Sequence, residues 1–189
     1  MRRAVVIVAA TVVVAAWMPP VQAATTTTTG DAPATTRAVS AEGPVRAMTP
    51  RASAKGGRGQ TLTVTPTSGL SAFGQTVRVS GRGFSETVGI YVGLCVLRPR
   101  GVQPSPCGGG MDQDGSSQAS AWISSNPPPY GANLAIPYKR GGKFSVRIKV
   151  SPRIGNVDCR ITRCAVVARA DHLRTFDRSW DVAVPVTFR

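Results

Sequence analysis

Short stretches in which apolar and polar residues alternate run through the chain from residue 60 to its end. Over 144–150, Phe, Val and Ile occupy every second position, and Ser, Arg and Lys occupy the positions between them. Because successive side chains of a strand point to opposite faces, this pattern predicts strands with one buried face. We expect strands at 61–65, 76–80, 89–97, 118–124, 134–137, 143–150, 164–170 and 181–188.

The predicted fold class is all-β. The β-branched runs are separated by Gly, Pro and Ser, which are turn residues. No stretch keeps a helical apolar period for even ten residues. Short strands of this number within residues 60–189 indicate an immunoglobulin-like antiparallel sandwich of about seven strands.

Two segments before residue 60 are expected to lie outside the sandwich. Residues 1–23 have an arginine pair, an apolar stretch and small residues near the end, which is typical of a secretory signal peptide cut after Ala23. Residues 24–59 are rich in Thr, Ala, Pro and Gly, so we expect a disordered arm. No later apolar run is long enough to span a membrane. We therefore expect a secreted protein, extracellular or loosely attached to the cell envelope.

The charge balance suggests a partner. The 189 residues include 23 Lys and Arg against 9 Asp and Glu, a formal net charge of +14. Much of the positive charge falls on the polar positions of the predicted strands, where it could hold anionic wall polymer or nucleic acid. Aromatic residues are not interleaved with the basic ones, which disfavours a base-stacking platform. A merely solvated basic surface is the alternative.

The four cysteines predict disulfides, because export favours their oxidation. Three pairings exist, and the most economical joins Cys95 to Cys107 and Cys159 to Cys164. Each bond would then close a local loop between neighbouring strands. A zinc site would need closer cysteine spacing or several histidines, and the chain has one histidine.

A family resemblance rests on motifs spread along the domain. The domain opens with LTVTPTSGL at 62–70. It continues with VRVSGRGF at 77–84, YVGLC at 91–95, VDC at 157–159 with Cys164 five residues later, and PVTF at 185–188. In order, spacing and cysteine placement they resemble the neocarzinostatin family of enediyne-antibiotic apoproteins. The resemblance covers most of residues 61–188. It implies a seven-stranded immunoglobulin-like sandwich with the two local disulfides, in which a cleft holds an apolar chromophore that damages DNA.

The resemblance also implies where a ligand would lie. The family lines its cleft with aromatic residues; at those positions this chain has Leu97, two residues after the first cysteine, and Met111, after the second. Trp122 and Tyr130 flank a run of three prolines and would supply flat apolar surface. We expect Leu97, Met111, Trp122 and Tyr130 to bind the ligand. An equal alternative has Trp122 folded back onto the sandwich as a structural residue.

Residues 121–131 and 169–181 are similar to the immunoglobulin-like modules of exported actinobacterial proteins that accompany haem-binding HtaA domains. That similarity makes His172, the only histidine, a candidate haem ligand.

No enzyme is predicted. His172 has Asp171 beside it and Ser179 nearby, but adjacent residues of a strand point to opposite faces, and no nucleophile-elbow motif is present. We expect no catalytic residue, no metal site and no cofactor.

The sequence thus predicts a secreted, monomeric, non-catalytic binding module that holds an apolar small molecule or an envelope partner. The alternative is a structural envelope module, bound to anionic wall polymer or associated with a haem-uptake system. DNA binding follows from the resemblance only.

Overall fold

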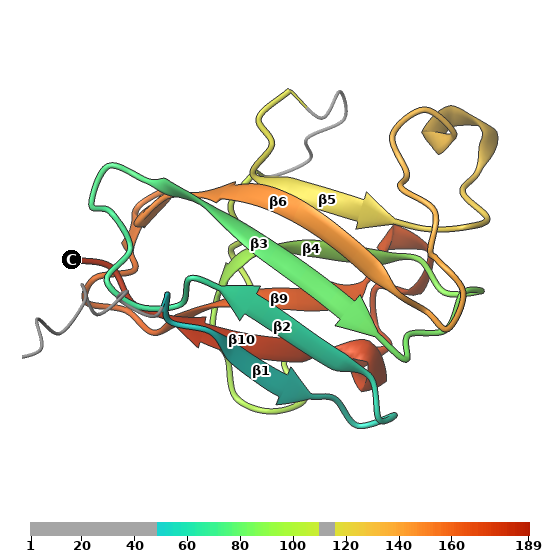
Figure 1. Cartoon of the computed structure of the whole chain (residues 1–189), viewed down its shortest axis with the longest axis horizontal. Coiled ribbons are helices and arrows are strands. Elements are labelled where there is room, and N and C mark those ends of the chain that lie inside the picture. Colours follow the sequence, from blue (N-terminus) through green and yellow to red (C-terminus); the bar gives the residue numbers. More distant parts are fainter. Residues whose placement is uncertain (1–48, 110–115) are drawn as a thin grey trace, which may run out of the picture. The chain divides into compact units, whose positions relative to one another are not determined.

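Two four-stranded antiparallel sheets form the layers of a sandwich (Figure 1). The computed structural model describes residues 49–109 and 116–189. The first sheet has the order β1-β2-β3-β6, with strands Ala52–Lys55, Thr61–Thr65, Gln75–Arg82 and Phe144–Val150. The second has the order β10-β9-β4-β5, with strands Val182–Val186, Cys164–Ala170, Ile90–Val96 and Ser120–Ile123. The all-β antiparallel prediction is confirmed.

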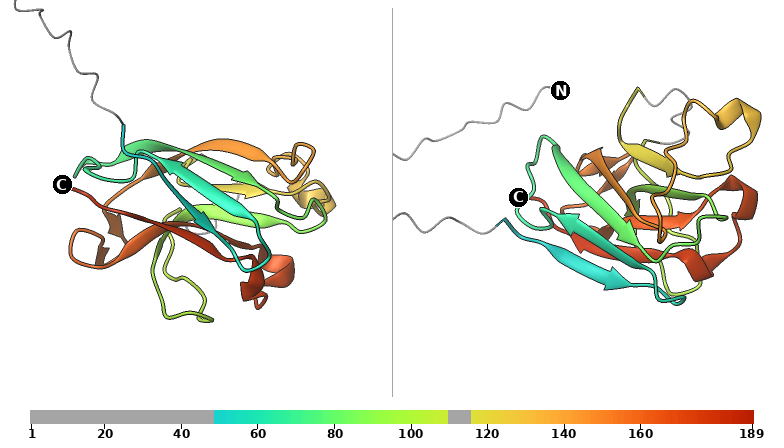
Figure 2. Two further views of the ribbon diagram at one scale, coloured as in Figure 1. Left: turned by 60° about the horizontal axis from the view of Figure 1, so that its bottom comes forward. Right: turned by 45° about the vertical axis from the view of Figure 1, so that its right-hand side comes forward.

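Smaller elements connect and flank the sheets. A two-stranded hairpin pairs β7 (Arg153–Ile154) with β8 (Val157–Asp158). Three single-turn 3₁₀ helices are η1 (Pro129–Gly131), η2 (His172–Arg174) and η3 (Arg178–Trp180). Figure 2 shows η2 and η3 at one end of the sandwich, and in its left view the loop after β4 extends on the outer side of the second sheet.

The core lies between the sheets and is built from the alternate positions that the sequence pattern indicates. On β6, Phe144, Val146, Ile148 and Val150 are buried, and the residues between them are exposed. They meet the inward side chains of the second sheet, among them Val92, Leu94, Val166 and Val184, in one cluster. Burial of these apolar side chains is the main favourable contribution to folding.

The predicted disordered arm is wrong in its last part. Within residues 24–59, β1 forms an edge strand whose residues pair with 61–64 of β2. Its alternating Ala, Ser, Ala and Lys give almost no hydrophobic signal, so the sequence does not reveal it. The strand exists because β2 offers it a row of backbone hydrogen-bonding groups. Residues 24–48 and the predicted signal peptide, 1–23, lie outside the described residues.

Two further differences concern the loops. The strand expected at 134–137 is only an isolated bridge between Ile123 and Ile136, because η1 turns the chain away from the sheet. The β7–β8 hairpin occupies a segment for which no strand was expected.

Both predicted disulfides are confirmed. Cys95 is bonded to Cys107 and Cys159 to Cys164, which leaves no free thiol. Within 49–109 and 116–189, no helix has the length and apolar character needed to cross a bilayer.

Candidate functional site

The outer face of the second sheet carries apolar residues where a solvated sheet would carry polar ones. Register places Gly93 opposite Val167 and Cys95 opposite Ala165, all pointing away from the core, and Val167 opposite Ala183 on β10. Antiparallel sheets commonly have one packed and one solvated face. Here the outer face is also apolar, which indicates that a loop of the protein or a ligand covers it.

These residues form a cluster that is separate from the core between the sheets. The outer apolar cluster comprises the buried Cys95, Ala165 and Val167 and the half-buried Leu97, Cys107 and Ala183. Its half-buried members give it an accessible rim. The cluster therefore offers apolar surface to a ligand as well as to the protein's own loop.

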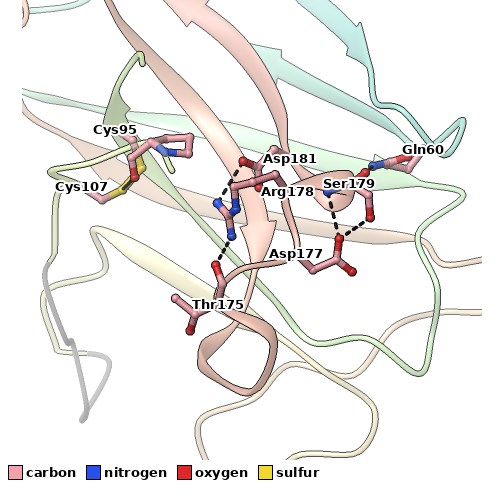
Figure 3. Close-up of polar contacts among 9 residues, drawn as sticks. Gln60, Cys95, Cys107, Thr175, Asp177, Arg178, Ser179 and Asp181 are labelled. Carbon is pink, nitrogen blue, oxygen red and sulfur yellow. Dashed lines mark hydrogen bonds and ion pairs between the residues drawn. A yellow bond between two sulfur atoms is a disulfide. The ribbon is translucent and has the colours of Figure 1, made fainter. Parts of the chain in front are cut away.

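The loop that closes the first disulfide covers part of this cluster. It is held at both ends by backbone hydrogen bonds: Val96 N–H donates to Pro106 O at 3.0 Å, and Gly108 N–H donates to Leu94 O at 2.7 Å. Together with the Cys95–Cys107 bond these contacts fix the loop against β4. Figure 3 shows the disulfide together with the side chains of the η3 region.

At the other end of the same face lies an aromatic cluster, formed by Tyr91, Trp122, Tyr130 and His172. The Tyr91 hydroxyl lies 2.5 Å from His172 Nδ1, and the Tyr130 hydroxyl lies 2.7 Å from His172 Nε2. The tautomer of the ring decides which tyrosine hydroxyl donates and which accepts. The Trp122 and His172 rings meet edge-on with centroids 5.2 Å apart. His172 thus joins three aromatic side chains from separate segments.

The Trp122 side chain is buried on the outer face of the second sheet and not in the core between the sheets. Its indole N–H donates to Asp171 Oδ2 at 3.0 Å, and Asp171 is itself 1% exposed. Two glycines make the close packing possible. A Cβ on Gly89 would lie 1.9 Å from Asp171 Oδ2, and a Cβ on Gly131 would lie 2.2 Å from the Trp122 ring.

A charged group borders the aromatic cluster on the β10 side. Arg178 Nη1 donates to Asp181 Oδ2 at 3.0 Å, and Arg178 Nη2 donates to the Thr175 carbonyl (Figure 3). Within the described part of the chain, the buried Arg178 Nε and Asp181 Oδ1 have no partner. The Arg169 guanidinium lies 5.8 Å from the centre of the Tyr91 ring. Burial raises the pKa of the Tyr91 hydroxyl and lowers the pKa of Arg169.

Burial also raises the pKa of Asp181, to about 6 from 3.8, although Arg178 and Arg169 favour its ionised form. A raised folded-state pKa means that this carboxyl contributes stability below pH 3.8 and that the contribution is lost as the pH rises through 6. We expect the free energy of unfolding of the wild type, minus that of Asp181→Asn, to fall between pH 4 and pH 7. Urea denaturation of both proteins across this range measures the difference. A difference in unfolding free energy that does not change with pH would contradict the raised pKa of Asp181.

The η3 turn is anchored to the first sheet's side of the molecule. The buried Gln60 donates from Nε2 to the Ser179 carbonyl at 3.0 Å, and Arg58 Nε donates to Ser179 Oγ at 2.7 Å. Ser179 in turn donates from N and Oγ to Asp177 Oδ1, as Figure 3 shows. Hydrogen bonds therefore fix the position of η3 and of Asp181, which follows it.

The four predicted ligand residues do not form one group. Trp122 and Tyr130 both belong to the aromatic cluster, whereas Leu97 belongs to the outer apolar cluster near the disulfide. Met111 lies outside the described residues. Tyr130 is 68% exposed, while Trp122 is 9% exposed and bonded to Asp171. Of these, Leu97 and Tyr130 present accessible surface, and Trp122 supports the site from beneath.

His172 has both ring nitrogens bonded to tyrosine hydroxyls, so ligation of a haem iron would require one of these bonds to break. The hydrolytic arrangement is not formed either: Asp171 bonds Trp122 and the Leu173 N–H, and Ser179 bonds Asp177. Asp171 lies directly after β9 and caps η2 through the Leu173 N–H. Neither Asp171 nor His172 belongs to a strand, so the expected alternation of faces does not apply to them. Within 49–109 and 116–189, no three His, Cys, Asp or Glu side chains are grouped to hold a metal ion.

Sequence reasoning missed the sheet residues Tyr91, Ala165, Val167, Arg169 and Ala183. One signal was available: β9 reads CAVVARA and is buried at six of its seven positions, without the alternation of β6. A strand that is apolar on both faces must be covered on both.

The similarity of this chain to known proteins identifies its family. Among curated proteins, none matches the chain significantly. The solved structure of macromomycin is similar, with 22% sequence identity and a TM-score of 0.44; the match covers 69% of this chain and 99% of that one. The model of the Neocarzinostatin family matches residues 62–188. The chain therefore belongs to the neocarzinostatin family.

Proposed function

We propose that this protein is a secreted, non-catalytic carrier that binds an apolar small molecule on the outer face of its second sheet. Membership of the neocarzinostatin family supports a small-molecule-binding apoprotein, not an enzyme. Two disulfides and no free thiol fit an extracellular protein.

The outer apolar cluster carries the proposal. It lies outside the core, and Leu97, Cys107 and Ala183 leave part of it accessible. A ligand placed there would remove apolar surface from water, which is the main driving force for binding such molecules. Gly93 and Ala165 are already buried by the protein itself, so the ligand would contact the half-buried Leu97, Cys107 and Ala183.

The aromatic cluster would bound the site at its other end. Tyr91 and Cys95 point to the same face of β4, four residues apart, which corresponds to about 13 Å along a strand. A ligand of two or three fused rings fits this length. Its apolar part would lie beside the disulfide, and a polar group would reach Tyr91 and Arg169.

The test uses Nile red, a neutral apolar dye whose fluorescence increases away from water. Wild-type protein is expected to bind it, and Ala183→Gln, which places a bulky polar side chain on the accessible rim, should weaken binding about tenfold. Because the dye is uncharged, attraction to the protein's positive charge contributes little.

Thr63→Gln is the matched control, because Thr63 is half-buried on the outer face of the other sheet. It should leave dye binding unchanged. Equal dye affinity for wild type and Ala183→Gln would show that the ligand does not use this face.

A further inference from the structure

The outer face of the first sheet consists of cations and hydroxyl groups. Register aligns them in rows across the strands: Lys55, Thr61 and Arg82 in one row, and Thr65, Arg78 and Arg147 in another. The row between them is Ser53, Thr63, Ser80 and Ser145, and Thr76 pairs with Lys149 beyond the second charged row. We call this surface the basic face; it includes the exposed Arg51 next to Thr65 and Arg78.

No carboxylate neutralises this surface within the described part of the chain. The four strands contain neither Asp nor Glu. The ion pairs found within 49–109 and 116–189 use Arg153, Arg160 and Arg178, all on other segments. The positive charge of the basic face is therefore available to a partner.

Arg78 and Arg147 are directly opposed on neighbouring strands. Side chains in such positions start from Cβ atoms about 4.5–5.5 Å apart, and like charges there are destabilising. Shallow hollows of about 320 Å³ and about 450 Å³ lie on either side of Arg78, the first also lined by Arg147 and the second by Arg51. An anionic group seated between the guanidinium groups would remove the repulsion and accept bidentate hydrogen bonds.

The extent of the basic face favours a polymer over a single anion. Arg78 and Arg82 are four residues apart on β3, about 13 Å, so one small anion cannot contact both rows. The face has no aromatic side chain on which a nucleic-acid base could stack. Its central row of Ser and Thr hydroxyls instead matches a chain that carries hydroxyl groups between its charges.

We propose that the basic face binds an anionic polymer of the cell envelope whose phosphate diesters alternate with polyol or sugar hydroxyls. The charged rows bind the phosphates, and the hydroxyl row bonds the polyol. The basic face lies on the first sheet and the proposed small-molecule site on the second. Each proposal can therefore be tested and rejected independently of the other.

The test measures binding of the full-length mature protein to purified poly(glycerol phosphate) across a salt series. Affinity should fall steeply with salt because bound counterions are released. The double variant Arg78→Ser/Arg147→Ser should bind about tenfold more weakly at low salt, with a shallower salt dependence by about 1–2 in log–log slope. Thermal unfolding of the variant should show no loss of stability, since the change removes a repulsion.

Arg100→Ser/Arg174→Ser is the matched control: it removes the same charge from two exposed positions off these strands and should lower affinity far less. Equal weakening by both double variants would show that net charge alone binds the polymer. Absence of binding by the wild type would also overturn the proposal. Tighter binding to duplex DNA than to poly(glycerol phosphate), at the same ionic strength, would assign the face to nucleic acid instead.

Discussion

Replacing Trp122 with alanine is expected to lower the free energy of unfolding by about 3–5 kcal/mol, the usual cost of removing a large buried aromatic side chain. The structure adds two specific losses. The buried Asp171 carboxylate loses the indole N–H that donates to it, and η1 and His172 lose the ring against which they pack. Urea denaturation followed by circular dichroism measures the change.

Tyr130→Ala is the matched comparison, because Tyr130 belongs to the same aromatic cluster but is 68% exposed. Its replacement should change stability by about 0.5 kcal/mol or less. If Trp122→Ala were as mild as Tyr130→Ala, Trp122 would not be the structural support described here. Weaker ligand binding by Trp122→Ala could therefore result from its lower stability. Tyr130→Ala tests direct contact between this cluster and the ligand better, because it should remain stable.

Removing the first disulfide, with Cys95→Ala/Cys107→Ala, is expected to destabilise the domain by about 3 kcal/mol according to the chain-entropy model for a loop of this length. The two cysteines are 12 residues apart. The loop that they close covers part of the outer apolar cluster, so its release should also alter Nile red binding. Equilibrium unfolding in urea gives the stability, and dye titration reports the exposed cluster.

The second disulfide provides the comparison. Cys159 and Cys164 are 5 residues apart, so their removal should cost only about 2 kcal/mol by the same model. This bond lies at the start of β9 and on the core side, and Cys159→Ala/Cys164→Ala should leave dye binding nearly unchanged. A greater stability loss from the shorter loop would mean that packing around the sulfurs outweighs chain entropy.

Most of the fold follows from alternation in the sequence. The sequence predicted seven of the strands, namely β2, β3, β4, β5, β6, β9 and β10. They could be predicted because successive side chains of a strand point to opposite faces, which gives an alternating sequence pattern. β1 was missed because alanine and serine differ little in hydrophobicity. The segment 134–137 was overestimated because it follows η1 and forms only one bridge to β5, with Ile136 exposed.

The candidate site was predicted less completely. Leu97, Trp122 and Tyr130 were identified as isolated residues, but the sequence does not reveal that His172 joins Trp122 to Tyr130. Tyr91 was missed because nothing local marks it; it enters the site only through its register with Arg169 on β9 and Trp122 on β5. Register depends on the pairing of distant segments, which one sequence does not display.

The sequence by itself determined the fold class, the two disulfide loops, the family resemblance and the excess of positive charge. These follow from short-range properties, namely side-chain alternation, cysteine spacing and composition. Only the tertiary structure decided which residues share a surface. It placed the apolar residues of β4, β9 and β10 on one outer face, and the basic and hydroxyl residues of the first sheet on the other. The physical reason is that two sheets packed through one core leave each an outer face, whose composition is set by which strands become neighbours.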